Sequence, residues 1–568
     1  GDRSAPSPSA SSAPHPHLWR WYGAYILGGY VLWSCISNKD GRYILPYLPL
    51  LSLFLAQGLG YWRRRWWRVP WLTVGLASLL LLLNLFPIAG SLGQGLTGLF
   101  TPGGQKWPDL NNWPQKAAIA TIAEAQPYQV VNVGLIGGSA TVNSHTLTFY
   151  GLQQDFRIYC RDMGDRQSLQ DSDLNSLGWF LTQQDPTVDL LSLPDPNQGQ
   201  ETVQKLLQDP RFTQTKTWPL PDGSQLQLFR RDPLPVTVEP LAEPPAHLLK
   251  QVNLFSDQTQ PVYLEQVNFA PLAPPGVPVP ITYTWVGPWS ALSQGLVLLD
   301  WQQKLPPIPE AESTGIQTWI HDHGIGLGTL PPLPIQANQV VLGPKVAPPE
   351  QWFRVTEHTA MLPPAAAIGG VYGLQAQYLN AKTGDLQPLA IPAVAITLDR
   401  DIPPSPSLAL DWSSELRDLA PRLREGREAL DDIFDRLGRV NLYDPIQNYL
   451  LQAEKTLEVR LDRDPTNLDY AYALALDRVL QRDPIGARSA LETVAQLDAE
   501  NPFAHAYGAF IHLVLFQPRK ALKSLEPALA LAPDNLELQA LQAAAHLLSG
   551  NLWAAWREGS QVLDRMNH

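Results

Sequence analysis

The chain has 568 residues, too many for one hydrophobic core at ~100–200 residues per domain, so we expect several domains. The net charge is −12, but residues 1–110 carry nine Lys and Arg against three Asp and Glu, which leaves +6 there and −18 in the remainder. The acidic remainder has no cluster of Lys and Arg for a phosphate backbone, which argues against a nucleic-acid-binding protein, and two cysteines exclude a disulfide framework.

The N-terminal 18 residues are rich in Ser and Pro, which predicts a disordered linker. The chain begins at Gly1 without a Met, and the stretch lacks the charged and apolar regions of a signal peptide. We therefore expect processing or truncation to have removed a preceding segment.

Three apolar runs follow, at 21–37, 43–62 and 69–86. Because a bilayer core of ~30 Å needs about 20 helical residues, these runs predict three transmembrane helices within residues 19–90. Helices buried in a soluble core are the alternative, which three such runs in 70 residues disfavour. Four arginines between positions 63 and 68 make the second loop cytoplasmic by the positive-inside rule. The protein is then integral to the plasma or inner membrane, with a cytoplasmic N-terminus and a non-cytoplasmic C-terminal region, periplasmic or extracellular.

The stretch 36–49 contains Arg42, Tyr43 and Pro46 in an Arg-Tyr-x-x-Pro arrangement. It resembles a late transmembrane segment of the GT-C glycosyltransferases, in the subgroup of protein O-mannosyltransferases and aminoarabinose transferases. The resemblance implies transfer of a hexosyl or pentosyl unit from a polyprenyl-phosphate donor at the non-cytoplasmic face, in many members with a divalent metal. It covers about the first 100 residues directly and the following α/β region more loosely.

In that family the catalytic carboxylate lies in the first extracytoplasmic loop, but the corresponding loop here has only Asp40 as an acid. The resemblance therefore implies the C-terminal part of such an enzyme, with no catalytic residue in this chain and any divalent metal in the missing part. Lys39, Arg42 and Tyr43 would hold the lipid phosphate of the donor. The alternative is that they are interfacial anchors.

Residues 113–232 predict a small extracytoplasmic α/β domain. Its signals are a helix at 113–125, strands at 130–136, 156–160, 189–193 and 213–220, a helix at 201–208 and a hairpin strand at 225–230. The turn at Gly137, Gly138 and Ser139 is followed by Asn143 as a helix cap, which permits a phosphate-binding interpretation. The turn matches neither the dinucleotide nor the P-loop motif, so that interpretation is weak.

Residues 233–404 have short, Pro-punctuated apolar segments that predict a β-rich, sandwich-like domain. His321 and His323 form a His-x-His pattern, with Glu357 and His358 later in the chain. Because no third ligand stands at a recognisable spacing, we expect no metal site and interpret these residues as surface or turn residues.

Residues 411–440 predict one amphipathic linking helix, with Ser413 or Ser414 as its cap. Beyond it, residues 441–568 predict tetratricopeptide (TPR) repeats, because small residues recur with the 34-residue period of that family. The alanines expected to pack between helices are Ala453, Ala487, Ala521 and Ala555 in one register and Ala475, Ala509 and Ala543 in another. The repeats either bind a protein or peptide in their groove or cap the neighbouring domain.

The predicted fold is thus a multi-domain membrane protein: transmembrane α-helices, a small α/β domain, a β-sandwich-like domain and a C-terminal α-solenoid. Two functions follow. The first is a membrane glycosyltransferase with an appended TPR interaction module, whose partners are membrane lipid and the polyprenyl-linked sugar donor. The second is a non-catalytic, membrane-anchored TPR scaffold that recruits envelope proteins.

Overall fold

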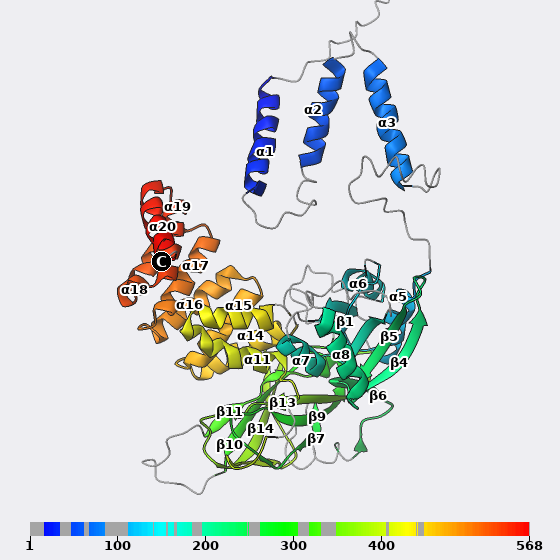
Figure 1. Cartoon of the computed structure of the whole chain (residues 1–568). Helices are drawn as coiled ribbons and strands as arrows, with labels where there is room; N and C mark the ends of the chain where they lie inside the picture. Colours follow the sequence, from blue (N-terminus) through cyan, green and yellow to red (C-terminus); the bar gives the residue numbers. More distant parts are fainter. Residues whose placement is uncertain are drawn as a thin grey trace, which may run out of the picture. The chain divides into compact units, whose positions relative to one another are not determined.

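The chain forms two compact units, Gly1–Asn111 and Asn112–His568, which we describe separately (Figure 1). The computed structural model describes residues 16–34, 47–61, 68–85, 112–139, 141–154, 157–163, 167–184, 196–246, 248, 262–304, 317–330, 348–404, 408–438, 440 and 448–566.

The first unit contains three described helices, α1 (Pro16–Ser34), α2 (Leu48–Tyr61) and α3 (Arg68–Leu85). None of the helices in the described part of the chain is both long enough and apolar enough to cross a membrane. The prediction of three transmembrane helices is therefore wrong.

For α1 and α2 the reason lies in where the helices begin and end. The second apolar run has 20 residues, but α2 has only 14, and at 1.5 Å per residue it extends ~21 Å against a bilayer core of ~30 Å. Pro49 is its second residue, a position that suits proline because the amides of the first helical turn have no partner within the helix. Helix α1 begins before its apolar run and so includes the polar His17 and Arg20.

The second unit begins with an α/β region around a five-stranded sheet of order β2-β1-β3-β5-β4 (Figure 1). Strands β1, β2 and β3 are parallel, and β5 pairs antiparallel with both β3 and β4. The elements are α5 (Gln115–Ala125), β1 (Val131–Ile136), α6 (Ser144–Leu152), β2 (Ile158–Asp162), α7 (Gln167–Ser176), β3 (Trp179–Gln184), α8 (Pro196–Gln208), β4 (Phe212–Pro219) and β5 (Gln225–Arg231).

Two short-range predictions for this region are confirmed, the helix cap at Asn143 and the hairpin. Asn143 caps α6 as predicted: its side chain accepts a hydrogen bond from the Thr146 amide, and the Thr146 side chain accepts one from the Asn143 amide. The hairpin of β4 and β5 is also confirmed. The strand expected at 189–193 lies outside the described residues, and β3, in the middle of the sheet, was not predicted.

Two further sheets enclose one apolar core that contains Trp285, Trp301 and Phe353. One sheet has the order β6-β13-β9-β7, and the other is built on the order β11-β10-β14-β16-β8, with β12 and β15 pairing at its side. Their elements are β6 (Val236–Leu241), β7 (Tyr263–Phe269), β8 (Leu272–Ala273), β9 (Val279–Pro288), α10 (Trp289–Leu292), β10 (Gly295–Gln303), β11 (Thr318–Ile320), β12 (His323–Gly324), β13 (Trp352–Met361), β14 (Gly370–Asn380), β15 (Leu386–Leu389) and β16 (Ala395–Leu398).

The linking segment is not one helix. It consists of α11 (Trp412–Leu419), the 3₁₀ helix η3 (Ala420–Glu425), α12 (Arg427–Ile433) and the π-helical turn η4 (Phe434–Gly438). Pro421 lacks an amide hydrogen and Gly426 has a φ of 83°, so the α-helical hydrogen bonds cannot continue through either. The predicted caps were also wrong, because the side chain that accepts a hydrogen bond at the start of α11 belongs to Asp411.

The C-terminal helices form a TPR-like solenoid of antiparallel neighbours (Figure 1). They are α14 (Asn448–Arg463), α15 (Leu468–Leu480), α16 (Pro484–Leu497), α17 (Pro502–Val514), α18 (Pro518–Leu531), α19 (Leu536–Leu548) and α20 (Leu552–Met566).

The 34-residue period appears in the backbone as well as in the alanines. Helices α15, α17 and α19 are each capped by an asparagine, and the turns after them each contain one residue with a positive φ. The caps are Asn467, Asn501 and Asn535, and the turn residues are Arg482, Phe516 and Gly550. Each repeat is therefore one helix pair with the same start and the same turn.

Candidate functional site

A cluster of charged side chains lies where the β-sheets meet the helices. We call it the buried polar junction, and it comprises His321, Asp322, His323, Glu357, Asp411 and Arg460. The interpretation of His321 and His323 as surface or turn residues is wrong, because each is only 1% exposed. His321 lies between β11 and β12 and His323 is the first residue of β12, with β9 and β13 on one side and the helical region on the other.

His321 is held at both ring nitrogens. Its Nδ1 lies 2.9 Å from the Tyr283 hydroxyl, and its Nε2 lies 3.1 Å from a carboxylate oxygen of Asp411. A carboxylate accepts, so Nε2 carries the proton, and the Tyr283 hydroxyl donates to Nδ1. The ring is then neutral, in agreement with burial, which lowers the pKa of His321.

His323 is also engaged at both nitrogens, but both of its partners are acceptors. Nδ1 lies 2.9 Å from the backbone carbonyl of His321, and Nε2 lies 3.1 Å from a carboxylate oxygen of Glu357. A ring that donates from both nitrogens is an imidazolium. Burial by itself lowers the pKa of His323, but the negative charge of Glu357 and its hydrogen bond outweigh this effect and raise the pKa.

Glu357 is the acceptor for three groups. Besides His323, it takes the indole N–H of Trp285 at 2.8 Å and the backbone amide of Gly326 at 2.5 Å. Glu357 follows Phe353 and Val355 in the period-two alternation of β13, so it points to the same buried face as they do. That alternation is the sequence signal that could have placed Glu357 inside the protein.

Asp322 and Arg460 join the sheets to helix α14. The Asp322 carboxylate receives two hydrogen bonds from the Arg460 guanidinium, both 2.8 Å long, and Arg460 also reaches Asp300 at 2.7 Å. Arg417 of α11 donates to the backbone carbonyl of Asp322 at 2.8 Å. These contacts connect positions 138 residues apart in the sequence.

The buried polar junction holds the β-sheets and the helices together. Neither imidazole has a ring nitrogen left to exchange a proton with a substrate, and each carboxylate faces a cation or a hydrogen-bond donor. In the part of the chain that the structure describes, no group of three or more His, Cys, Asp or Glu side chains is placed to hold a metal ion.

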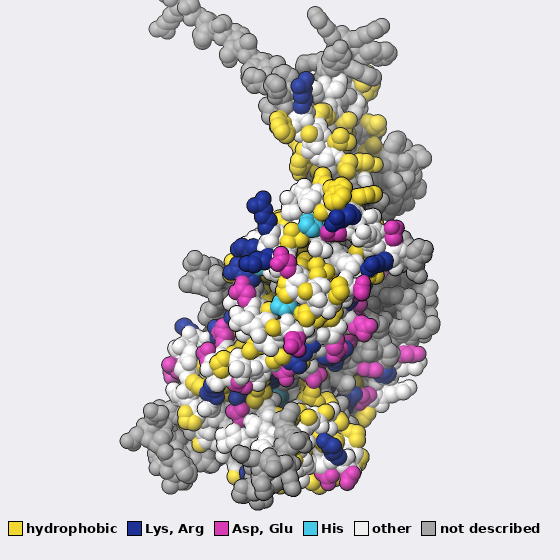
Figure 2. Space-filling model, turned by 90° about the vertical axis from the view of Figure 1, so that its left-hand side faces the viewer, with side chains coloured by type: hydrophobic (Ala, Val, Ile, Leu, Met, Phe, Trp, Pro, Cys, Tyr) yellow, Lys and Arg dark blue, Asp and Glu magenta, His cyan; other side chains and the backbone are white. Residues whose placement is uncertain are grey.

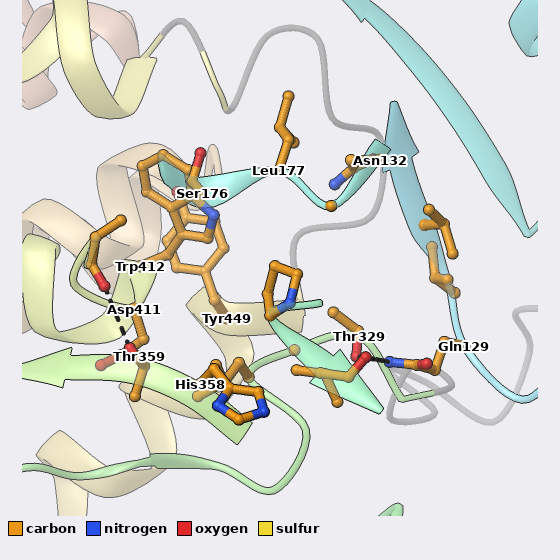
Figure 3. Close-up of a pocket in the computed structure, with 18 of the residues that line it drawn as sticks. Gln129, Asn132, Ser176, Leu177, Thr329, His358, Thr359, Asp411, Trp412 and Tyr449 are labelled. Atoms are coloured by element: carbon orange, nitrogen blue, oxygen red, sulfur yellow. Dashed lines mark hydrogen bonds between the residues drawn. The ribbon is translucent and has the colours of Figure 1, made fainter. Parts of the chain in front are cut away.

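A small cavity adjoins the junction, and side chains from three parts of the unit surround it (Figure 3). Asn132 and Ser176 come from the α/β region, His358 and Thr359 from β13, and Trp412 from α11. Its volume is about 130 Å³, below the ~300–1,000 Å³ of pockets that enclose a substrate-sized ligand. We therefore assign the cavity no substrate.

Close backbone packing accounts for a glycine in the turn after β1. A Cβ atom on Gly138 would lie 2.7 Å from the Val142 carbonyl, and the Ser139 amide donates to that same carbonyl. The glycine is thus needed for a close approach of backbone to backbone.

A larger cavity lies between the helices. We call it the helical groove, and its volume is about 340 Å³. Its surface is almost entirely apolar. The side chains that line it include Leu430, Phe434, Ala475, Val479, Phe503, Ala506, Tyr507, Phe510, Leu538 and Leu541.

One side of the groove is formed by α15, α17 and α19, the first helices of consecutive repeats, and the other by α12 and η4. The linking segment is anchored there by polar contacts. Tyr507 donates its hydroxyl to the Leu423 carbonyl at 2.8 Å, and Asn501 donates to the Arg424 carbonyl at 3.2 Å. Arg427 and Glu537 face each other at 3.8 Å at the rim.

The seven predicted packing alanines lie in the repeat helices. Six of them are buried, and Ala555 of α20 is half-buried. Lys39, Arg42 and Tyr43, the predicted lipid-phosphate ligands, lie outside the described residues. Apart from Ala475, the groove residues were not predicted from the sequence, and the α12 side of the groove comes from the segment that was predicted to be one continuous helix.

No protein-family model matches this chain, and no curated protein matches it. Among solved structures the chain is similar to MamA, a TPR-containing protein. One crystal structure of MamA is 14% identical over 27% of this chain and 93% of MamA, with a TM-score of 0.20. MamA of AMB-1 is 18% identical over 27% of this chain and 90% of MamA, also with a TM-score of 0.20. At these scores the likeness adds nothing to the repeat geometry, which by itself identifies the TPR-like solenoid.

Proposed function

We propose that this chain is a protein-interaction scaffold whose helical groove binds an amphipathic helix of a partner protein. The observation that carries the proposal is the apolar groove itself. Phe510 of α17 is 54% exposed within it, and exposed aromatic side chains beside a hydrophobic cavity are typical of interface hot spots.

The size and the walls of the groove support a helical ligand. A cavity of about 340 Å³ accommodates a few large apolar side chains, and an amphipathic helix presents such side chains at positions i, i+3 or i+4 and i+7. An extended peptide would need backbone hydrogen-bond partners, and the groove surface is almost entirely apolar. The rim carries one charge of each sign, Arg427 and Glu537, and so does not select strongly for ligand charge.

The structure also bears on whether the repeats bind a partner or cap a neighbouring domain. Helix α14 packs on the sheets through Arg460, and the linking segment fills part of the concave side of α15 and α17. The first repeat is therefore used within the chain. The cavity between α12, α17 and α19 stays uncovered by the described residues and is the part that we assign to a partner.

The test uses the whole chain and a display library of 12-residue peptides as the probe. We expect the enriched peptides to be apolar at helical spacing and to bind Phe510→Glu at least 10-fold more weakly, about 1.4 kcal/mol. Leu531→Glu is the matched control, since Leu531 of α18 is 46% exposed and lies outside the groove. Enrichment of polar peptides, or equal weakening in both variants, would refute the proposal.

The proposal does not extend to sugar transfer. The residues that carry the resemblance to GT-C glycosyltransferases lie outside the described residues, and no described residue is given a role in that reaction. Recruitment of envelope proteins and a non-cytoplasmic location of the repeats stay predictions from the sequence.

A further inference from the structure

Helix α20 carries a second apolar surface, separate from the helical groove. We define the α20 face as Leu552, Trp553, Trp556, Gly559 and Leu563. Leu552, Trp556, Gly559 and Leu563 follow the spacing i, i+4, i+7, i+11 and share one side of the helix. The exposed fractions of Leu552, Trp553, Trp556 and Leu563 are 66%, 70%, 78% and 62%.

The repeat itself shows what such a face does. The residues of α18 that lie 34 positions before Trp556, Gly559 and Leu563 are leucines, and all three pack in a core with Leu538, Leu541 and Ala545 of α19. These leucines are Leu522, Leu525 and Leu529. In the preceding pair this side therefore belongs to an apolar core shared with α17 and α19, and among the described residues no helix follows α20 to complete such a core.

The area available is enough for a specific contact. An aromatic side chain has ~150–250 Å² to bury, so two tryptophans and two leucines that are mostly exposed give on the order of 600 Å² per chain. Two such faces together bury on the order of 1,200 Å², which is the lower end of the range for stable protein interfaces. Apolar patches of this kind on a folded protein mark interaction sites.

We infer that the α20 face is an interface between two copies of this chain. The face is complementary to itself: when two α20 helices run antiparallel about a two-fold axis near Gly559, Trp556 of each copy lies against Leu563 of the other. Gly559 permits a close approach of the helix axes because it has no side chain. The space beside it is open, since a Cβ atom there would meet nothing within 4 Å.

The charges around the face agree with a second copy as the occupant. Arg557 pairs with Glu558 at 3.2 Å, and Arg565 lies 3.8 Å from Asp534. The surrounding surface thus holds both signs already paired, and it offers no net charge by which a strongly acidic or basic partner would be recognised. Figure 2, viewed from the side of the C-terminal helices, shows apolar side chains at the surface among charged ones of both signs.

Disulfide trapping on the full chain tests the inference. In a Cys35→Ser background, with Cys160 buried and inert, Gly559→Cys should form covalent dimers on mild oxidation. Gln561→Cys, about half a helical turn away on the other side of α20, is the matched control and should form at least five-fold fewer. Adding Trp556→Glu to Gly559→Cys should abolish the crosslink.

A mass measurement separates this interface from any other self-association. In sedimentation velocity, the parent chain should show a dimer. Trp556→Glu should remove the dimer and leave the monomer, and Gln561→Glu should leave the dimer unchanged. The inference is overturned if Gly559→Cys gives no dimer, if both cysteine positions crosslink equally, or if Trp556→Glu sediments like the parent chain. A partner protein or another helix that covers α20 gives the first of these results.

Discussion

The helical region meets its surroundings in two different ways. At α14 it is joined to the β-sheets by buried charges, with Arg460 held between Asp322 and Asp300. Between α17 and α20 it carries two exposed apolar surfaces, the helical groove and the α20 face. Buried charges require partners with defined geometry, whereas apolar surface accepts any complementary shape. The buried charges therefore fix the orientation of α14 on the sheets, whereas the apolar surfaces suit reversible binding of other molecules.

The largest effect should come from removing the cation at the polar junction. Arg460→Met removes the two hydrogen bonds that the guanidinium donates to the buried Asp322 carboxylate, which we expect to cost ~3–5 kcal/mol of unfolding free energy. Urea unfolding followed by circular dichroism measures it. Arg463→Met removes only an exposed contact to Gln377 and should cost less than ~0.5 kcal/mol. Equal stability of both variants would mean that α14 is not held by these charges.

The paired histidine should make the junction sensitive to pH. His323→Gln removes the cation beside Glu357, and we expect it to cost ~3 kcal/mol at pH 6. Because the folded pKa of His323 is raised above its unfolded value of ~6.5, the stabilisation is complete below that value and is lost as pH rises through the folded pKa. The difference between parent and variant should therefore shrink by pH 9. The urea midpoints of the parent and His323→Gln at pH 6 and pH 9 measure this difference. A difference that grows with pH would contradict the positive charge assigned to His323.

The stability of the C-terminal helices should depend on side-chain volume, because their contacts are apolar. Ala521 is completely buried between repeat helices, so Ala521→Leu should cost ~1–3 kcal/mol through overpacking. Ala555, one period later on α20, is half-buried, and Ala555→Leu should cost less than half as much. Thermal unfolding of the two variants gives the comparison, and equal losses would show that α20 is packed as tightly as α18.

The smallest effect on stability should come from the groove. Phe510→Ser removes a side chain that is more than half exposed, and we expect less than ~0.5 kcal/mol of change in unfolding free energy. The same variant should lose binding of helical peptides, because the ring lies in the apolar surface of the groove. If stability fell by several kcal/mol while binding stayed intact, the groove would be a core and not a binding site.

Short-range features of this fold were readable from the sequence. Asn143 caps the helix that follows it, the hairpin of β4 and β5 forms at its turn, and the 34-residue alanine spacing corresponds to the helix pairs of the solenoid. In these cases the interacting residues are close in sequence or repeat at a fixed interval, so the pattern itself contains the contact.

Other features were decided only in three dimensions. The apolar runs near the N-terminus have the length of membrane spans, but none of the helices described there is both long enough and apolar enough to cross a membrane. The linking segment reads as one amphipathic helix, yet Pro421 and Gly426 divide it.

By itself, the sequence determined the 34-residue repeat, the Asn143 cap and the hairpin of β4 and β5, because each depends on residues that are close in the chain or that recur at a fixed interval. Only the tertiary structure decided that His321 and His323 are buried, one neutral and one charged, because Asp411 lies 90 residues from the first and Glu357 lies 34 from the second. The same holds for the groove, whose two sides come from separate segments. Whether a charge is buried or an apolar side chain stays exposed depends on what packs against it, and the residues that pack together are often far apart in the sequence.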